Sequence, residues 1–273
     1  MGVDYLAIGH VSRDLTAEGE RVGGSVSYAS LTARALGLRA AVLTSYAEGY
    51  ADKALAQIPR QVIPAAETTT FALEETEHGR TLRLLARAAP IPPDAPLPPA
   101  WERAPIVHLA PIAQEVASEI AQRFAGRFVG VTPQGWMRRW DESGVVRAAE
   151  WENAAAVLGF ASAVVLSDED LPQGCDLNAL TEAVQVLVLT HGARGATLFW
   201  ENERIPIPAP EVPAVDSTGA GDIFAAAFFI RLYHTRDPIE SAHFATALAA
   251  DSVTRRGLQS VPSPERVRTV LKA

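Results

Sequence analysis

Apolar and polar positions follow two alternating patterns along most of the chain. Continuously apolar segments of strand length predict strands at Val3–Gly9, Ala41–Thr44, Ile106–Ala110, Phe128–Val131, Val164–Leu166, Val186–Thr190 and Thr197–Trp200. Segments with apolar residues every three or four positions predict helices at Gly24–Leu36, Gln114–Phe124, Gly219–Tyr233, Pro238–Thr254 and Pro264–Leu271. Because buried strands that alternate with helices are typical of a parallel sheet covered on both faces, we predict an α/β fold.

Two segments interrupt this alternation. Arg13–Val22 is short, polar and strand-like, and Thr68–Ala88 has the pattern of a β-hairpin that turns near His78 and Gly79. Neither fits a sheet with helices on both faces, so we predict that they join into a small β-lid over one edge. The expected organisation is a single α/β domain over residues 1–273, with lid segments at about 13–22 and 68–88.

Composition narrows the class of protein. The 273 residues are 48% hydrophobic and carry a net charge of −8, which disfavours nucleic acid and anionic membranes as partners. Cys175 is the single cysteine, so no internal disulfide can form and a reducing cytoplasm is expected. No signal peptide is recognised, and the longest weakly polar stretch, Ala154–Leu166, is too short to cross a bilayer. Neither Lys53 nor Lys272 follows a glycine, so the Gly-Lys-Ser/Thr loop of P-loop nucleotidases is absent.

The stretch Val215–Phe224 combines a glycine-rich turn with the start of a strongly apolar helix. The first amides of a helix lack partners within the helix and lie at the positive end of its dipole. Glycines allow a phosphate to approach such a backbone closely. Gly219, Ala220 and Gly221 therefore predict an anion hole for a phosphoryl group.

Asp222 would lie in the first turn of this helix, beside the predicted anion hole. Phosphoryl transfer from ATP to an alcohol needs positioning, charge stabilisation and a base for the hydroxyl proton, and Asp222 could supply the base. Taken alone, the aspartate is equally well explained by helix capping. A dinucleotide-binding loop does not fit, because the third glycine of G-x-G-x-x-G is missing.

The motif Asp216-Ser217-Thr218-Gly219-Ala220-Gly221-Asp222 and the helix after it resemble the C-terminal signature of the ribokinase-like (PfkB) carbohydrate kinases. The resemblance implies a ribokinase-like three-layer α/β/α sandwich with a mostly parallel sheet and a small β-lid. It also implies Asp222 as the catalytic base and the Gly219–Gly221 amides as the anion hole. Asp216 would order the loop, in many members around a monovalent cation, which leaves a K⁺ requirement open.

The resemblance extends along most of the chain and implies further site residues. On the acceptor side, Gly23-Gly24 resembles the family's di-glycine, where the backbone approaches the sugar, and Asp14 stands where the family binds sugar hydroxyls. Each of these is otherwise an ordinary turn or loop residue. The residues expected to bind nucleotide are Thr190, Gly192, Gly195, Ser217, Thr218 and Gly257.

The chain departs from the family pattern at two places. Where the family usually has Asn-x-x-Glu to hold Mg²⁺ through water, this chain has Ser167 and Asp170. Asp170 keeps the charge but has a shorter reach, and Ser167 could simply cap a helix, so the Mg²⁺ role of Asp170 is left open. Tyr28 replaces the Asn common in the family, and it could bind substrate or be part of the core. The segment Thr132–Arg138 resembles the inositol-kinase-like branch, which makes a cyclitol a candidate substrate.

The sequence therefore predicts a cytoplasmic phosphotransferase, a monomer or homodimer, that uses ATP and Mg²⁺. It would move the γ-phosphate to a hydroxyl of a sugar or cyclitol bound near Asp14, Gly23, Gly24 and Tyr28. Three alternatives stay open. They are a nucleoside kinase, a non-catalytic regulator that binds nucleotide or polyol, and an unrelated α/β protein whose glycine-rich turn is only structural.

Overall fold

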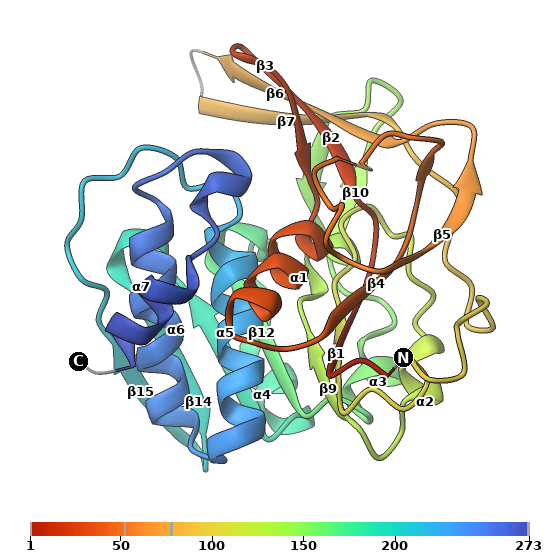
Figure 1. The fold of residues 1–273 in the computed structure, drawn as a ribbon. Helices are drawn as coiled ribbons and strands as arrows, with labels where there is room; N and C mark the ends of the chain where they lie inside the picture. Colours follow the sequence, from red (N-terminus) through yellow and green to blue (C-terminus); the bar gives the residue numbers. More distant parts are fainter. Residues whose placement is uncertain (1, 52, 77–78, 272–273) are drawn as a thin grey trace.

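The apolar segments pair into a nine-stranded sheet in the computed structural model, which describes residues 2–51, 53–76 and 79–271 (Figure 1). In spatial order its strands are β15 (Glu203–Ile207), β14 (Ala196–Trp200), β13 (Val186–Thr190), β12 (Ala163–Ser167), β9 (Phe128–Val131), β8 (Ile106–Leu109), β1 (Tyr5–Ile8), β4 (Ala40–Ala47) and β5 (Arg60–Ala65). The pairs from β5 to β13 are parallel, whereas β13–β14 and β14–β15 are antiparallel. The predicted mostly parallel α/β sheet is confirmed.

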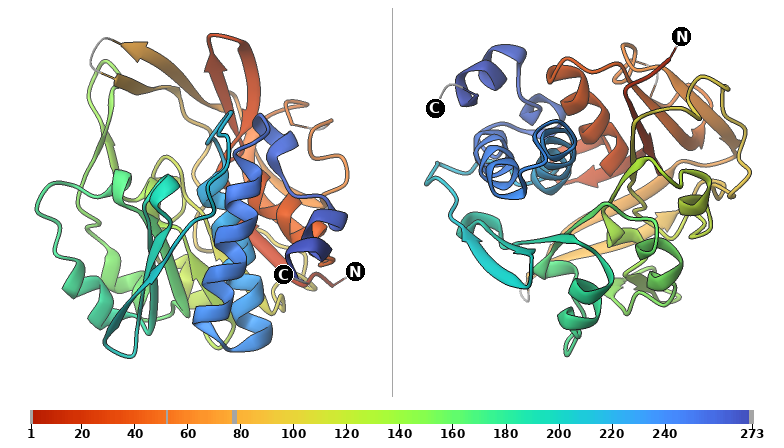
Figure 2. Two further views of the ribbon diagram at one scale, coloured as in Figure 1. Left: turned by 90° about the vertical axis from the view of Figure 1, so that its left-hand side faces the viewer. Right: turned by 90° about the horizontal axis from the view of Figure 1, so that it is seen from below.

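Helices cover both faces of this sheet, as Figure 2 shows. One face carries α1 (Ser25–Ala35), α5 (Ala220–Thr235), α6 (Pro238–Ser252) and α7 (Pro264–Val270), and the other carries α2 (Ile120–Arg123), α3 (Ala154–Leu158) and α4 (Leu177–Ala183). Alternate strand residues supply the two cores: Ala7 faces α1 and α5, while Leu6 and Ile8 face α2 and α3. Over the described residues, no helix has the length and apolar character needed to span a bilayer.

The expected helix at Gln114–Phe124 is wrong over most of its length, because only Ile120–Arg123 is helical. Gln114 has a positive φ of 56°, which is incompatible with a helix at that residue. The buried Glu115 carboxylate accepts hydrogen bonds from the amides of His10, Ile112 and Ala113. The apolar periodicity of this segment therefore belongs to a buried loop whose amides bond to a side chain.

A second, four-stranded sheet lies above the end of the main sheet in Figure 1. Its order is β3 (Gly19–Gly23), β2 (Ser12–Thr16), β6 (Thr69–Thr76) and β7 (Gly79–Ala86), and we call it the lid sheet. The expected hairpin turn near His78 and Gly79 includes residues 77–78, which lie outside the described residues. The short pair β10 (Arg138–Trp140) and β11 (Val146–Ala148) adjoins β7 through a bridge between Arg83 and Val145.

Helix α5 packs closely against the centre of the main sheet. Its residues Phe228 and Phe229 are fully buried, and Phe229 lies over Gly130 of β9. A Cβ atom at Gly130 would lie 2.4 Å from the Phe229 ring, so a glycine there sets how near the helix can come.

We expect Gly130→Ala to lower the free energy of unfolding by about 1–3 kcal/mol, because the added methyl would overpack a dense interior. Equilibrium denaturant unfolding measures the change. Gly159→Ala is the control, since the nearest atom to a Cβ there is 3.7 Å away, and its effect should stay within about 0.5 kcal/mol. Equal losses in the two variants would contradict this account of the α5 contact.

Candidate active site

Helix α5 begins at Gly219, which has the left-handed backbone conformation with φ 81°. A Cβ atom at Gly219 would lie 2.4 Å from the ring of Tyr28 in α1, so both the conformation and the close approach require glycine. The first α-helical bond runs from the amide of Ile223 to the carbonyl of Gly219, at 2.9 Å. Gly221 is exposed, and a Cβ atom there would have no other atom within 4 Å. The helix start is therefore open to an anion, as the predicted anion hole requires.

Asp222 lies in the first turn of α5, half-buried beside this helix start. Burial raises the pKa of its carboxyl from 3.8 to about 6, and the charges of Asp170 and Asp14 act in the same direction. A hydrogen bond from Ser25 and the charge of Arg138 oppose the rise in pKa. Asp222 can therefore accept a proton near neutral pH, which a general base must do.

The acceptor-side residues meet where β2, β3 and α1 come together. Gly23 ends β3, and a Cβ atom there would lie 2.0 Å from Oδ2 of Asp14. The hydroxyl of Ser12 donates to Oδ1 of Asp14 at 2.7 Å. Gly24 precedes α1 as its N-cap. The residues that the sequence assigned to the acceptor thus lie together, at one end of α1.

Tyr28 connects this group to the anion hole. Its side chain is 3% exposed and packs on Gly219, so it is part of the core as well as a neighbour of the site. Burial raises the pKa of the Tyr28 phenol, and the charges of Asp222, Asp14 and Asp216 raise it further. The phenol is therefore neutral at physiological pH and retains a proton to donate.

Asp216 bonds to backbone amides that flank the turn before α5 and to an arginine that the sequence analysis did not assign to it. Its Oδ1 accepts from the amide of Thr218 at 3.0 Å, and its Oδ2 accepts from the amide of Gly257 at 3.3 Å. The guanidinium of Arg21, in lid strand β3, donates to the same Oδ2 at 3.0 Å. The turn that carries Ser217 and Thr218 is thus tied both to the C-terminal segment and to the lid sheet.

The carboxyl ends of β12 and β13 bring together the other expected nucleotide residues. Thr190 ends β13, and Gly192 lies in the short 3₁₀ turn that leads to Gly195. Both ring nitrogens of His191 have partners, Asp168 Oδ2 and Thr197 Oγ1, each at 2.9 Å. His191 is therefore held in place by its neighbours.

Ser167 and Asp170 differ in what they contact. Ser167 caps a 3₁₀ turn by accepting from the amide of Glu169 at 3.2 Å, which is the capping alternative left open for it. Both oxygens of Asp170 accept from Nε2 of Gln134, at 3.1 and 3.2 Å, and Oδ1 lies 3.9 Å from the Arg138 guanidinium. Burial raises the pKa of the Asp170 carboxyl, while Arg138 and Gln134 oppose that rise.

These contacts bear on which ions the site could hold. No group of three His, Cys, Asp or Glu side chains with metal-binding geometry occurs among the described residues. Asp170 shares its two oxygens with an amide, so a contact with Mg²⁺ through water fits it better than direct ligation. Asp216 already has a guanidinium as counter-charge, so a monovalent cation beside it fits poorly.

Two arginines of the site were missed at the sequence level. Arg138 appeared only as the last residue of the segment Thr132–Arg138, and Arg21 only as a residue of a lid segment. Their positions relative to the carboxylates depend on pairing between segments far apart in the sequence, as the separation of 195 residues between Arg21 and Asp216 illustrates. An unusual arginine inside an apolar-rich segment was the only local signal for Arg138.

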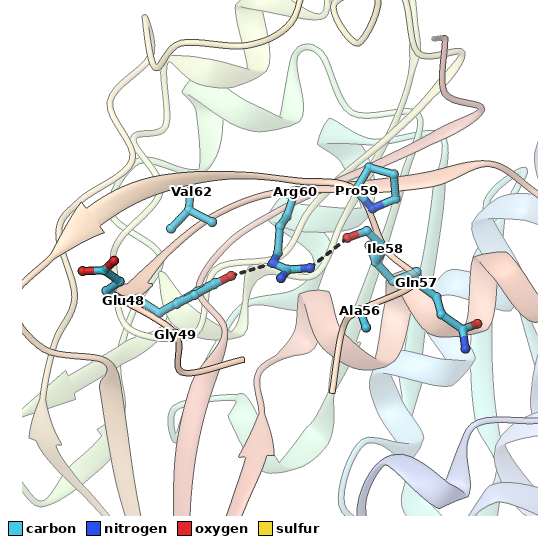
Figure 3. A pocket seen from close by; sticks show the side chains of 9 residues that line it. Glu48, Gly49, Ala56, Gln57, Ile58, Pro59, Arg60 and Val62 are labelled. Atoms are coloured by element: carbon cyan, nitrogen blue, oxygen red, sulfur yellow. Dashed lines mark hydrogen bonds between the residues drawn. The ribbon is translucent and has the colours of Figure 1, made fainter. Parts of the chain in front are cut away.

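An open pocket of about 600 Å³ lies apart from this group, between β4, β5 and the turn before β5 (Figure 3). Arg60 crosses it and donates to the Tyr46 hydroxyl at 2.7 Å and to the carbonyl of Ile58 at 3.2 Å. None of the predicted site residues lines this pocket. We therefore assign Arg60 to holding β5 on β4.

Part of the chain matches known proteins in sequence. Residues 160–266, which include the motif from Asp216 to Asp222, match the family described as pfkB family carbohydrate kinase. Mus musculus ribokinase is 40% identical over 85 residues, which are 30% of this chain and 26% of that protein. The chain spans less than half the length of the curated relatives that it matches.

Solved structures match over nearly the whole chain and establish a ribokinase-like fold. A variant of pyrophosphate-dependent myo-inositol-1 kinase converted into a myo-inositol-3 kinase has a TM-score of 0.81 at 19% identity and covers 98% of both chains. The Arabidopsis thaliana ribokinase complexed with ribose and ATP has a TM-score of 0.73 at 18% identity and covers 100% of both chains. The expected ribokinase-like α/β sandwich is confirmed, and residues 160–266, which match the family model, form its C-terminal part.

The contact between Arg21 and Asp216 can be tested by a double-mutant cycle with Arg21→Met and Asp216→Asn. The two side chains are only 27% and 15% exposed, so we expect a coupling free energy of about 1–2 kcal/mol. Denaturant unfolding of the four proteins measures it.

The control pair for this cycle is Arg139 and Glu152. These side chains approach to the same 3.0 Å, but they are 38% and 71% exposed. Because exposed ion pairs contribute little, we expect a coupling below about 0.5 kcal/mol. A coupling for Arg21 and Asp216 no larger than that of the control would show that this contact does not hold the lid sheet to the turn.

Proposed function

We propose that this chain is a kinase that transfers the γ-phosphate of ATP to a hydroxyl group of a sugar or cyclitol. One arrangement carries the proposal: the Asp222 carboxyl lies in the first turn of α5, at a helix start that is open at Gly221 and packed on Tyr28 at Gly219. Burial raises the pKa of Asp222, and the charge of Asp14 acts in the same direction. An anion hole, a base and a polar acceptor pocket are the parts that phosphoryl transfer requires.

In the proposed reaction, Asp14 accepts a hydrogen bond from one substrate hydroxyl and so orients the ring, while Tyr28 can donate to another. Asp222 takes the proton of the reacting hydroxyl. The new bond joins that oxygen to the γ-phosphorus, and the bond from the γ-phosphorus to the bridging oxygen breaks, so its electron pair leaves with ADP. The amides of Gly219–Gly221 bind the phosphoryl oxygens during the transfer.

Magnesium would screen the charge of the donor phosphates and polarise the phosphorus for attack. Asp170 is the residue of this chain that we propose to reach it through water. The positive charge beside Asp216 comes from Arg21 in this chain, so we propose that activity does not require K⁺.

Charge in the acceptor region favours a neutral substrate. The charges of Asp14 and Asp170 act on the Asp222 carboxyl, and all three carboxylates act on the guanidinium of Arg138. A substrate with its own phosphate or carboxylate would meet this excess of negative charge. A neutral polyol such as a sugar or cyclitol avoids that repulsion, and a nucleoside is the second neutral class.

The direct test is ADP release from ATP and Mg²⁺ with a panel of aldoses, ketoses, cyclitols and nucleosides. We expect turnover with a neutral polyol, and much weaker turnover with sugar phosphates or sugar acids. Pyrophosphate is assayed as a parallel donor, because the myo-inositol kinase with the same fold uses it. Binding of ATP without turnover on any acceptor would favour the non-catalytic regulator instead.

The proposed role of Asp222 as the base predicts how the activity depends on pH. The base must be ionised, so kcat/KM should fall about tenfold per pH unit below about 6 and level off above it. Asp222→Asn should lower turnover by about 10²–10⁴-fold and remove this limb. The exposed Asp94 offers a matched control, because Asp94→Asn removes the same charge far from these residues and should leave turnover unchanged. Turnover like wild type in Asp222→Asn would remove Asp222 from the mechanism.

The same variant separates a catalytic defect from misfolding. The folded-state pKa of Asp222, about 6, lies above its ordinary value of 3.8, so the folded protein binds more protons than the unfolded chain between these values. Asp222 therefore lowers the free energy of unfolding as the pH rises from about 4 to about 6. Asp222→Asn should be at least as stable as wild type at pH 7, as measured by denaturant unfolding.

A further inference from the structure

Arg138 is a cation enclosed by elements from three parts of the chain. It lies at the start of β10, its side chain is 16% exposed, and its Nη1 donates to the carbonyl of Ile112 at 3.1 Å. The guanidinium lies over the ring of Phe71 in lid strand β6, with its carbon 5.8 Å from the ring centre. Arg138 thus lies where the lid sheet meets the core.

The charges of four carboxylates act on this guanidinium: Asp170, Asp222, Glu115 and Asp14. Each of them also has another hydrogen-bond partner: Gln134 for Asp170, backbone amides for Glu115, Ser12 for Asp14 and Ser25 for Asp222. Among the described residues, the ion-pair contact of Arg138 is the long one of 3.9 Å to Asp170. The guanidinium therefore lies near several carboxylates but forms no bidentate salt bridge with any of these four.

An arginine has five N–H donors in a planar fork that matches the oxygens of a carboxylate or phosphate. Within the described part of the chain, the Arg138 side chain gives one hydrogen bond, to Ile112. Enclosing a cation with so few partners is costly unless a ligand completes its hydrogen bonds. Arg138 lies 3.9 Å from Asp170, the residue proposed to reach Mg²⁺, and its charge also acts on the proposed base Asp222. We expect the ligand that completes its hydrogen bonds to be an anion.

We propose that Arg138 is a catalytic residue that binds the oxygens of the phosphoryl group while it passes from the donor to the acceptor hydroxyl. The inference rests on the proposed function and adds a side-chain cation to the amides of α5. The bonds that form and break are those given above: oxygen to γ-phosphorus forms, γ-phosphorus to bridging oxygen breaks, and the hydroxyl proton goes to Asp222. Arg138 transfers no proton itself, because a guanidinium stays protonated in this pH range.

A purely structural role would give Arg138 a different task, namely to hold Asp170 and the loop at Ile112. Three variants distinguish the two roles: Arg138→Lys, Arg138→Gln and Arg138→Ala. Lysine keeps the charge without the fork, glutamine keeps polar atoms without the charge, and alanine leaves space for free guanidinium ion. The matched control is Arg139→Gln on the same strand, whose guanidinium pairs with the exposed Glu152.

The first readout is steady-state turnover with the acceptor found in the panel. We expect Arg138→Gln to lower kcat by about 10²–10³-fold, the usual loss for a group that stabilises transition-state charge, with the acceptor KM changed by less than about threefold. We expect Arg138→Lys to lie between this variant and wild type. Added guanidinium should restore Arg138→Ala at least about tenfold, and Arg139→Gln should stay within about twofold of wild type.

The second readout does not depend on having found the acceptor. Calorimetry measures binding of ADP and Mg²⁺ with and without aluminium fluoride, a mimic of the planar phosphoryl group. Wild type should bind tighter with the fluoride, and Arg138→Gln should lose most of that gain while it binds ADP alone as wild type does. The same gain in both proteins, or no guanidinium rescue and a kcat within about threefold of wild type, overturns the role of Arg138. Silence of wild type in the acceptor panel alone overturns only the proposed acceptor class.

Discussion

The N-terminus of α5 approaches α1 as closely as it does because Gly219 has no side chain. A Cβ atom there would lie 2.4 Å from the Tyr28 ring, and a second close approach, between Gly130 and Phe229, holds the middle of the same helix on the sheet. With these two contacts in place, the open amides of α5, the Asp222 carboxyl and the acceptor residues of β2, β3 and α1 come within reach of one another. Pushing the helix outward would separate the proposed base Asp222 from the proposed acceptor residues without changing any of these groups themselves.

This packing also determines which charged side chains lie near Asp222. Asp14, Asp170 and Asp222 are drawn into one region by three different parts of the fold, and the charges of Asp14 and Asp170 both raise the pKa of the Asp222 carboxyl. Two arginines compensate, Arg138 inside the region and Arg21 at its edge beside Asp216. This group of neighbouring carboxylates therefore lowers the stability of the folded protein. We interpret that cost as the consequence of keeping a base and a cation ready for a phosphoryl group, as active sites commonly do.

The order of elements and the open helix start at Gly219 could be predicted from local patterns, because periodicity reports which face of a segment is buried. The same rule failed at Gln114–Phe124, where Glu115 turns its carboxylate inward and bonds to backbone amides of a loop. Apolar spacing cannot distinguish a helix from a buried loop whose amides are satisfied by a side chain. Tyr28 shows a related limit, because its sequence position allowed core or site, and its contact with Gly219 makes it both.

The sequence by itself determined the alternation of strands and helices, the glycine-rich start of α5 and the aspartate in its first turn. These features depend on residues close together in the chain, and the chemistry of a helix N-terminus is local. Only the tertiary structure decided which charges meet. The strand order of the main sheet and the lid sheet brings Arg21 to Asp216 across 195 residues and Arg138 to Asp170 and Asp222. No local pattern encodes such pairs, because the distance between two charges is set by how whole elements pack.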